Sequence, residues 1–161
     1  MAWGLAPSLR APSMKHRLLE LLCCPACGGS FALSVFAEDR EVEEGCLVCE
    51  GCAKTFPVIK GIPRLLPDQL APLVVQFHKA FFQRYADAMA SYVARCQDIP
   101  WDPWWYAEHR TLRSYSYQWR TFKQMLPHWE QVFVDSIAPI PPAFFRGKLG
   151  LDAGCGFGRS L

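Results

Sequence analysis

Cysteines in two pairs are the first residues of this sequence whose types and spacing suggest chemistry. The first Cys-x-x-Cys pair is Cys24 with Cys27. The second pair is Cys49 with Cys52, and 21 residues separate the two pairs. Such a turn directs two sulfurs toward one point, and Gly28 suits the positive φ that it often needs. Because zinc takes four thiolates in closed tetrahedral sites, the spacing predicts a structural zinc ion held by Cys24, Cys27, Cys49 and Cys52.

Neighbouring thiols leave the ligand set open at each pair. Cys23 precedes Cys24 and could replace it, and Cys46 forms a further Cys-x-x-Cys pair with Cys49. We favour Cys24 because a proline and a glycine then occupy turn positions. We favour Cys52 because it pairs with Cys49 just before the strand candidate "KTFPV". Cys23 and Cys46 are then packed thiols. A redox pair would need a βαβ context, disulfides need an oxidising compartment, and iron–sulfur clusters usually have other spacings.

Glycines near the C-terminus form the second chemical pattern, "LGLDAGCGFG" at positions 149–158. Residues 149–151 are predicted to be a short buried strand, and Asp152, Gly154, Gly156 and Gly158 follow it at alternate positions. Glycine lets the backbone turn sharply and approach a ligand closely. In α/β sheets such a loop leads into a helix whose N-terminus faces the ligand. The dinucleotide fingerprint differs, because the third glycine comes one residue early and Arg159 stands in its place.

Composition bounds the class of protein. The chain has 161 residues, of which 51% are hydrophobic and 20% are charged, a globular balance. The net charge of +2 and the absence of a Lys/Arg block give no strong nucleic-acid signal. No apolar run reaches the roughly 18 residues of a membrane helix, and the start has no signal-peptide core. We therefore expect a cytoplasmic protein without a membrane segment, whose thiols stay reduced.

The chain divides into four zones with an α+β character. Residues 1–13 are expected to be a disordered leader. Residues 14–67 hold six of the eight cysteines and three strand candidates, "SFALSVFA", "GCLVCE" and "KTFPVIK", after a short helix in "KHRLLELL". Residues 68–146 are a helical linker or cap, with one long helix over 68–96 started by an Asp68 cap and a later helix in "HWEQVFVDSIA". Residues 147–161 begin a Rossmann-like domain.

The cysteine-rich zone carries a family resemblance. "LLELLCCPACGG" and "LVCEGCAKTFPVIKGIPRLLP" resemble the small zinc-ribbon family whose stand-alone members bind and activate methyltransferases acting on tRNA, ribosomal RNA and release factors. The match covers about residues 14–67. The resemblance implies a module that supports a methyltransferase, either as its partner or fused to it.

The glycine pattern carries a second resemblance, to the first motif of class I S-adenosylmethionine-dependent methyltransferases. It implies that the loop with Gly154, Gly156 and Gly158 runs past the methionine part of S-adenosyl-L-methionine. By the same resemblance, Asp152 holds the loop and the amino group of the cofactor. "SYSYQWRTF" is similar to the aromatic segment ahead of this motif in fused methyltransferases, so Tyr117 and Trp119 either cover the cofactor or form an aromatic core.

These patterns together predict the N-terminal part of an S-adenosylmethionine-dependent methyltransferase, a transferase with a structural zinc ribbon. A class I domain needs a further hundred or more residues, so the truncated domain is expected to be inactive in this chain. No catalytic residue can be assigned, since His109 and His128 are interpreted as surface or core residues. The methyl acceptor, a small molecule, protein or RNA, is not identified. The alternative is a non-catalytic zinc-ribbon adaptor that binds and activates a partner methyltransferase.

Overall fold

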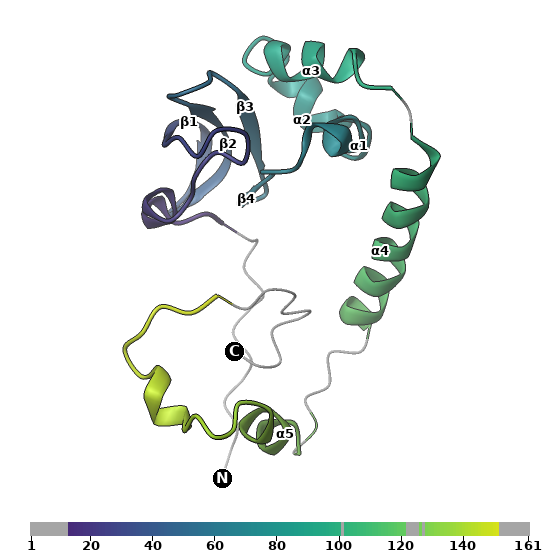
Figure 1. Cartoon of the computed structure of the whole chain (residues 1–161). Helices are drawn as coiled ribbons and strands as arrows, with labels where there is room; N and C mark the ends of the chain where they lie inside the picture. Colours follow the sequence, from purple (N-terminus) through teal and green to yellow (C-terminus); the bar gives the residue numbers. More distant parts are fainter. Residues whose placement is uncertain (1–12, 101, 122–125, 127, 152–161) are drawn as a thin grey trace. The chain divides into compact units, whose positions relative to one another are not determined.

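The computed structural model of the chain describes residues 13–100, 102–121, 126 and 128–151 (Figure 1). The chain divides into two compact units, residues 1–101 and 102–161. Most of the predicted leader and the glycine-rich loop from Asp152 onward lie outside the described residues.

The first unit contains a four-stranded antiparallel sheet in the order β1-β2-β3-β4. The strands are β1 (Phe31–Glu38), β2 (Val42–Cys49), β3 (Thr55–Ile59) and β4 (Ile62–Pro63). The three predicted strands are confirmed. The short helix predicted before them is the 3-10 helix η1 (His16–Glu20). Ahead of it, the backbone of Met14 pairs with Val42 through hydrogen bonds of 2.7 and 3.0 Å.

Strands β2 and β3 carry buried apolar side chains on both faces of the sheet. Successive side chains of a strand point to opposite faces, and in β2 Leu47 and Cys49 lie in one buried cluster whereas Cys46 lies in another. In β3, Phe56 belongs to the first cluster and Ile59 to the second. Every residue of β3 is buried, because this strand is covered on both faces.

The first cluster joins the sheet to the segment that precedes it. Phe31 and Phe56 meet edge to face with ring centroids 5.8 Å apart, a favourable aromatic geometry. Partly buried leucines of the N-terminal segment, Leu18, Leu19 and Leu22, pack against this cluster. The buried members are Met14, Cys24, Phe31, Val42, Leu47, Cys49, Phe56 and Val58.

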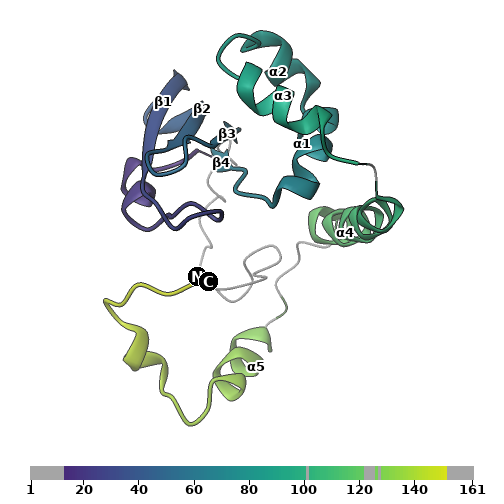
Figure 2. The same cartoon turned by 45° about the horizontal axis from the view of Figure 1, so that its top comes forward.

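The second cluster joins the sheet to three short helices. They are α1 (Ala71–Phe77), α2 (Lys79–Arg84) and α3 (Ala90–Gln97), preceded by the 3-10 turn η2 (Asp68–Leu70). Figures 1 and 2 show them grouped beside β3 and β4. The prediction of one long helix over 68–96 is therefore wrong, because the backbone leaves helical geometry at His78 and Tyr85.

The breaks have a geometric reason. A single helix of that length would extend about 44 Å, whereas the eight residues of β2 span about 27 Å. Three short helices can instead turn Phe81, Met89 and Tyr92 onto the same sheet face, where they are 4%, 0% and 1% exposed.

The predicted helix cap at Asp68 is also wrong. Pro67 occupies the cap position of η2, and no side-chain cap bond forms there. The Asp68 carboxylate instead accepts a 2.6 Å hydrogen bond from Lys54 Nζ, and Arg95 Nε lies 3.4 Å from its other oxygen. Lys54, just before β3, and Arg95, in α3, therefore bind the Asp68 carboxylate, which is then not available to cap the helix.

The second unit contains α4 (Pro103–Thr121), α5 (Trp129–Ser136) and the 3-10 turn η3 (Pro142–Phe145). Asp102 starts α4, since its Oδ1 accepts a 2.8 Å hydrogen bond from the Trp104 amide. The later predicted helix is confirmed as α5. Over the residues that the structure describes, no helix is both long and apolar enough to cross a membrane.

The strand predicted at residues 149–151 is wrong. The chain has no regular structure there, and Leu149 and Leu151 are 70% and 94% exposed. A buried parallel strand needs neighbouring strands to accept its backbone hydrogen bonds and cover its side chains, and residues 102–121 and 128–151 of this unit supply none.

Candidate metal centre

Four sulfurs meet between two turns of the first unit. Cys24 and Cys27 lie in the turn between η1 and β1, Cys49 ends β2, and Cys52 lies in the turn to β3. Their Sγ atoms all lie within 4.8 Å of one another. The Sγ atoms of Cys27 and Cys49 are 3.4 Å apart, and those of Cys24 and Cys52 are 3.7 Å apart.

The first turn is held by backbone hydrogen bonds. The Gly28 amide donates to the Cys24 carbonyl over 2.8 Å, and the Cys24 amide donates to the Gly29 carbonyl over 2.8 Å. Gly28 has φ of +75°, as its position after the Cys-x-x-Cys pair predicts. The Ala26 amide also donates to Cys24 Sγ over 3.4 Å, so the backbone of the turn holds this sulfur in place.

The second turn repeats this pattern. The Ala53 amide donates to the Cys49 carbonyl over 2.9 Å, and the Cys49 amide donates to the Lys54 carbonyl over 2.8 Å. Ala53 takes the place of Gly28 and has φ of +57°. The two cysteine pairs are therefore carried by two equivalent turns, one with glycine and one with alanine at the left-handed position.

This difference between the turns predicts opposite effects of two substitutions. Ala53→Gly should stabilise the zinc-loaded chain by about 0.5–1 kcal/mol, because glycine has no Cβ to strain at positive φ, and Gly28→Ala should destabilise it by about 1 kcal/mol. The space beside Gly28 is open, so backbone strain alone acts there. Urea unfolding measures both. Ala94→Gly, in α3, is the control and should destabilise; a destabilising Ala53→Gly would contradict the prediction.

Gly29 is a site residue that the sequence analysis missed. A Cβ on Gly29 would lie 3.1 Å from Cys49 Sγ and 3.3 Å from Cys27 Sγ. Both distances are tighter than ordinary contacts, so a side chain here would push two sulfurs apart. The repeated glycine in "CPACGG" was the signal that could have indicated this close approach.

Hydrogen bonds shift the acidity of two thiols in opposite directions. The Cys52 amide, helped by the Gly51 amide and two neighbouring thiols, outweighs burial and lowers the pKa of Cys49 to about 7. At Cys27, the Gly29 amide lowers the pKa, but the thiols of Cys49, Cys52 and Cys24 together with burial raise it to about 12. Of these two thiols, Cys49 therefore ionises first, and Cys27 keeps its proton until a cation offsets the charge.

The four sulfurs fit zinc in donor type and spacing. A tetrahedron with Zn–S bonds of about 2.3 Å has edges of about 3.8 Å, close to the 3.4 and 3.7 Å separations of the two nearest pairs. Four thiolates also fill all four tetrahedral positions, which is typical of a structural site. The cluster is therefore that of a metal-binding zinc-ribbon domain.

The other predicted residues lie elsewhere. The prediction of a packed thiol is wrong for Cys23, which is exposed because it lies on the outer side of the turn next to buried Cys24. It is confirmed for Cys46, which is buried in the second cluster and is not among the four clustered sulfurs. Tyr117 is 66% exposed on α4. The side chains of Trp119 and His109, and the predicted cofactor residues Asp152, Gly154, Gly156 and Gly158, lie outside the described part of the chain.

A small antiparallel sheet with four sulfurs between two equivalent turns defines the class as a zinc ribbon. Residues 15–61 match the family model described as "Trm112p-like protein". A UPF0434 protein of Coxiella burnetii is 38% identical over 61 residues, which are 38% of this chain and 96% of the relative. A UPF0434 protein of Edwardsiella ictaluri is 42% identical over 60 residues, 37% of this chain and 91% of the relative.

The chain belongs to the Trm112p-like family through this ribbon. Among solved structures, it is similar to a chain from the complex of the Haloferax volcanii Trm112 methyltransferase activator, with 33% identity, a TM-score of 0.34, and coverage of 35% of this chain and 98% of that one. The family match confirms the predicted resemblance to a small zinc-ribbon family over residues 15–61. The helical zone and the glycine-rich stretch lie beyond the matched residues 15–61.

Proposed function

We propose that the ribbon is a non-catalytic module that binds and activates a methyltransferase in the cytoplasm. The observation that carries this proposal is membership of the Trm112p-like family over residues 15–61, in a domain whose four-cysteine cluster is intact. This family relates to methyltransferase activation and not to catalysis. The alternative drawn from the sequence is therefore favoured over an enzyme contained in this chain.

The metal has a structural role in this proposal. Cys24, Cys27, Cys49 and Cys52 would hold one zinc ion, which cross-links the two turns and leaves no coordination position for a substrate. The residues matched to the family are too few to bury much apolar surface, and zinc contributes about 10–16 kcal/mol to the folding of such units at neutral pH. The zinc would then hold the two turns of the ribbon together, and the ribbon's own residues would bind the partner.

The sequence favours a second candidate, in which the ribbon serves a class I methyltransferase domain of the same protein. The supporting observation is the "LDAGCGFG" pattern. In this version Asp152, Gly154, Gly156 and Gly158 bind S-adenosyl-L-methionine, and the methyl acceptor is a small molecule, a protein or RNA. The codons after Leu161 test it: an apolar strand ending in Asp or Glu about 20 residues on would supply the ribose-binding acid of such a fold.

Reconstitution tests the activator proposal. The class I methyltransferases of the source proteome are purified one by one, and methyl transfer from tritiated S-adenosyl-L-methionine into RNA and protein is measured with and without this chain. At least one enzyme should form a stable complex and gain at least about tenfold in rate, since an activator must bind its enzyme and stabilise its active form. No complex and no gain with any of them would overturn the proposal.

A further inference from the structure

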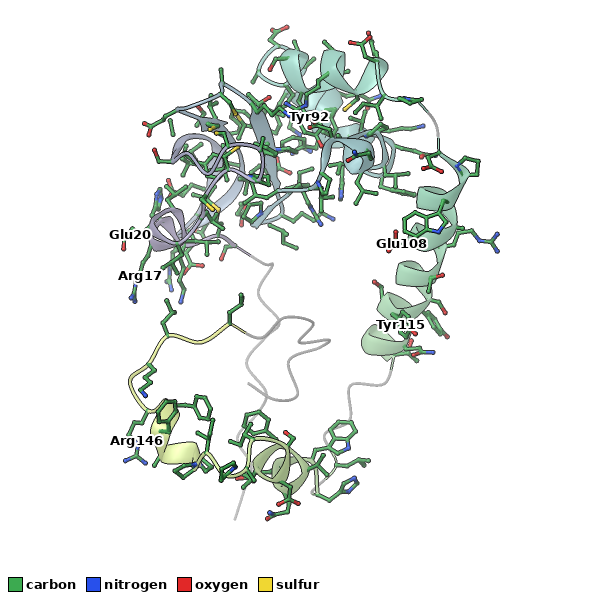
Figure 3. All side chains as sticks on the ribbon, viewed as in Figure 1. Arg17, Glu20, Tyr92, Glu108, Tyr115 and Arg146 are labelled. Carbon is green, nitrogen blue, oxygen red and sulfur yellow. The ribbon has the colours of Figure 1, made fainter. Side chains whose placement is uncertain are left out.

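Arg64, which directly follows β4, is a half-buried cation that forms no ion pair within the described part of the chain. Its Nε atom is buried and has no hydrogen-bond partner there. Burial lowers the pKa of Arg64, and the Tyr92 hydroxyl opposes this effect only in part. Figure 3 shows Tyr92 between the strands and the helices. Because burial of an unpaired charge is costly, this guanidinium favours the binding of an anion beside it.

A second arginine of the same unit has the usual arrangement. The Nε atom of Arg95 is also buried without a hydrogen bond, but it lies 3.4 Å from Asp68 Oδ1. Arg95 Nη2 also donates to the Thr55 carbonyl over 3.1 Å. The ion pairs among residues 13–100 include none with Arg64. Arg64 therefore differs from Arg95 in that no carboxylate of these residues offsets its charge.

Two further basic side chains lie near Arg64. Burial, and after it the charges of Arg64 and Lys60, lower the pKa of His78. Because electrostatic effects weaken with distance, the three groups lie close together. The packing agrees, since Ile59, next to Lys60, and Val74, whose carbonyl accepts a 3.0 Å hydrogen bond from the His78 amide, belong to one buried cluster. The result is a local excess of positive charge beside an imidazole that can donate a hydrogen bond.

The backbone at Lys60 indicates that this lysine has a role beyond the fold. Lys60 and Gly61 have φ of +51° and +67° and form the two-residue turn between β3 and β4, where Ile59 pairs with Ile62. A turn with two left-handed residues favours asparagine or glycine, and a longer side chain there is strained. Strain of this kind is common at ligand sites. The fold would therefore gain from another residue here, whereas an anion site gains from the lysine.

We infer that Lys60, Arg64 and His78 form a binding site for one phosphate group of a small ligand. Arginine presents a planar set of donors that matches phosphate oxygens, and lysine adds a compact charge. The net charge of +2 without a Lys/Arg block fits contact with a single phosphate and not a groove along a nucleic acid. Cys24 and Cys49 belong to the other buried cluster, so this site is separate from the metal centre. The inference goes beyond the proposed function and does not depend on it.

Thermal unfolding of the zinc-loaded full chain tests the inference, with inorganic phosphate as the probe. Phosphate is titrated against chloride at constant ionic strength, and metal analysis checks that zinc stays bound. The midpoint of the wild type should rise by at least about 4 °C once phosphate exceeds its dissociation constant about tenfold, because the ligand binds the folded state. A midpoint that does not respond to phosphate would overturn the inference.

Arg64→Met separates a binding role from a structural role. The variant should be at least as stable as the wild type in chloride, because an apolar chain replaces a buried, unpaired charge. Its midpoint should not respond to phosphate. An arginine that only supports the fold would give the opposite result: lower stability in chloride and an unchanged response to phosphate. Retention of the phosphate response in this variant would therefore overturn the inference.

Lys60→Asn gives an independent test at the strained turn. The variant should be more stable than the wild type in chloride, since asparagine tolerates a positive φ. It should bind phosphate about tenfold more weakly, because a charge-assisted contact is lost. Lys15→Asn is the matched control: Lys15 is exposed and has an ordinary φ of −71°, so this variant should keep the full phosphate response. Equal weakening by both changes would show only a general effect of charge and contradict the proposed site.

Two further ligands identify the source of the phosphate. Uridine 5′-monophosphate carries a terminal phosphate, and an RNA oligonucleotide without terminal phosphates carries phosphodiesters only. The mononucleotide should stabilise the wild type but not Arg64→Met. A larger, Arg64-dependent effect of the RNA would overturn the assignment to a small ligand. No methyltransferase takes part in these measurements, so failure here is distinct from failure of the proposed function.

Discussion

Changing Cys49 to serine is expected to abolish zinc binding and unfold the ribbon. Cys49 is 1% exposed, and its Sγ lies 3.4 Å from that of Cys27, so a serine hydroxyl there replaces one of four thiolates with a poor zinc ligand. Because zinc supplies on the order of 10 kcal/mol to the folding of such units, the whole first unit should lose its cooperative transition. Metal analysis should fall from about one ion per chain to almost none, with loss of the thermal transition in circular dichroism.

Two further serine variants are the controls for this result and decide the ligand alternatives. Cys23 is exposed and lies next to Cys24, so Cys23→Ser should keep both zinc and stability. Cys46 is buried in the second cluster, so Cys46→Ser should cost stability but keep zinc. Retention of zinc by Cys49→Ser, or its loss in Cys23→Ser, would contradict the proposed ligand set.

The strands and the sulfur cluster were predictable because their signals are local. Apolar residues in "SFALSVFA" alternate with other residues, and this period of two predicts a strand. A Cys-x-x-Cys turn brings its two sulfurs together within a few residues. The position of Gly28 directly after a Cys-x-x-Cys pair likewise predicted its positive φ. The equivalent role of Ala53 was hidden, since alanine carries no signal for a left-handed backbone.

The helical zone was harder because its geometry is set by a distant surface. Phe77, Phe81, Tyr85 and Met89 recur at the spacing of one continuous helix face, and neither glycine nor proline marks the breaks at His78 and Tyr85. Packing against the sheet determines where the helix breaks. As a consequence, Phe77 remains 43% exposed while Met89 is fully buried. Asp68 is a similar case, since its ion pairs with Lys54 and Arg95 depend on the tertiary fold.

Phe56→Ala is expected to be the most destabilising change that spares the zinc ligands. Phe56 is 1% exposed, contacts Phe31 edge to face, and has the Arg95 guanidinium 5.6 Å from its ring centroid. It lies in β3, which is buried along its whole length, so the surroundings cannot collapse into the space that the ring leaves. Truncation of a buried phenylalanine costs about 3–5 kcal/mol, a large part of the roughly 5–15 kcal/mol that stabilises a typical domain.

Thermal unfolding at saturating zinc measures this cost. A loss of 3–5 kcal/mol should lower the midpoint by at least roughly 12 °C in a domain of this size, while zinc content stays at about one ion per chain because no ligand has changed. Val35→Ala is the control on the same sheet: Val35 is 41% exposed, and the midpoint should barely move. If Phe56→Ala behaved like Val35→Ala, zinc alone would hold the ribbon together. If zinc were lost as well, the two turns would depend on the aromatic core for their alignment, and the metal and the core would act as a single cooperative unit.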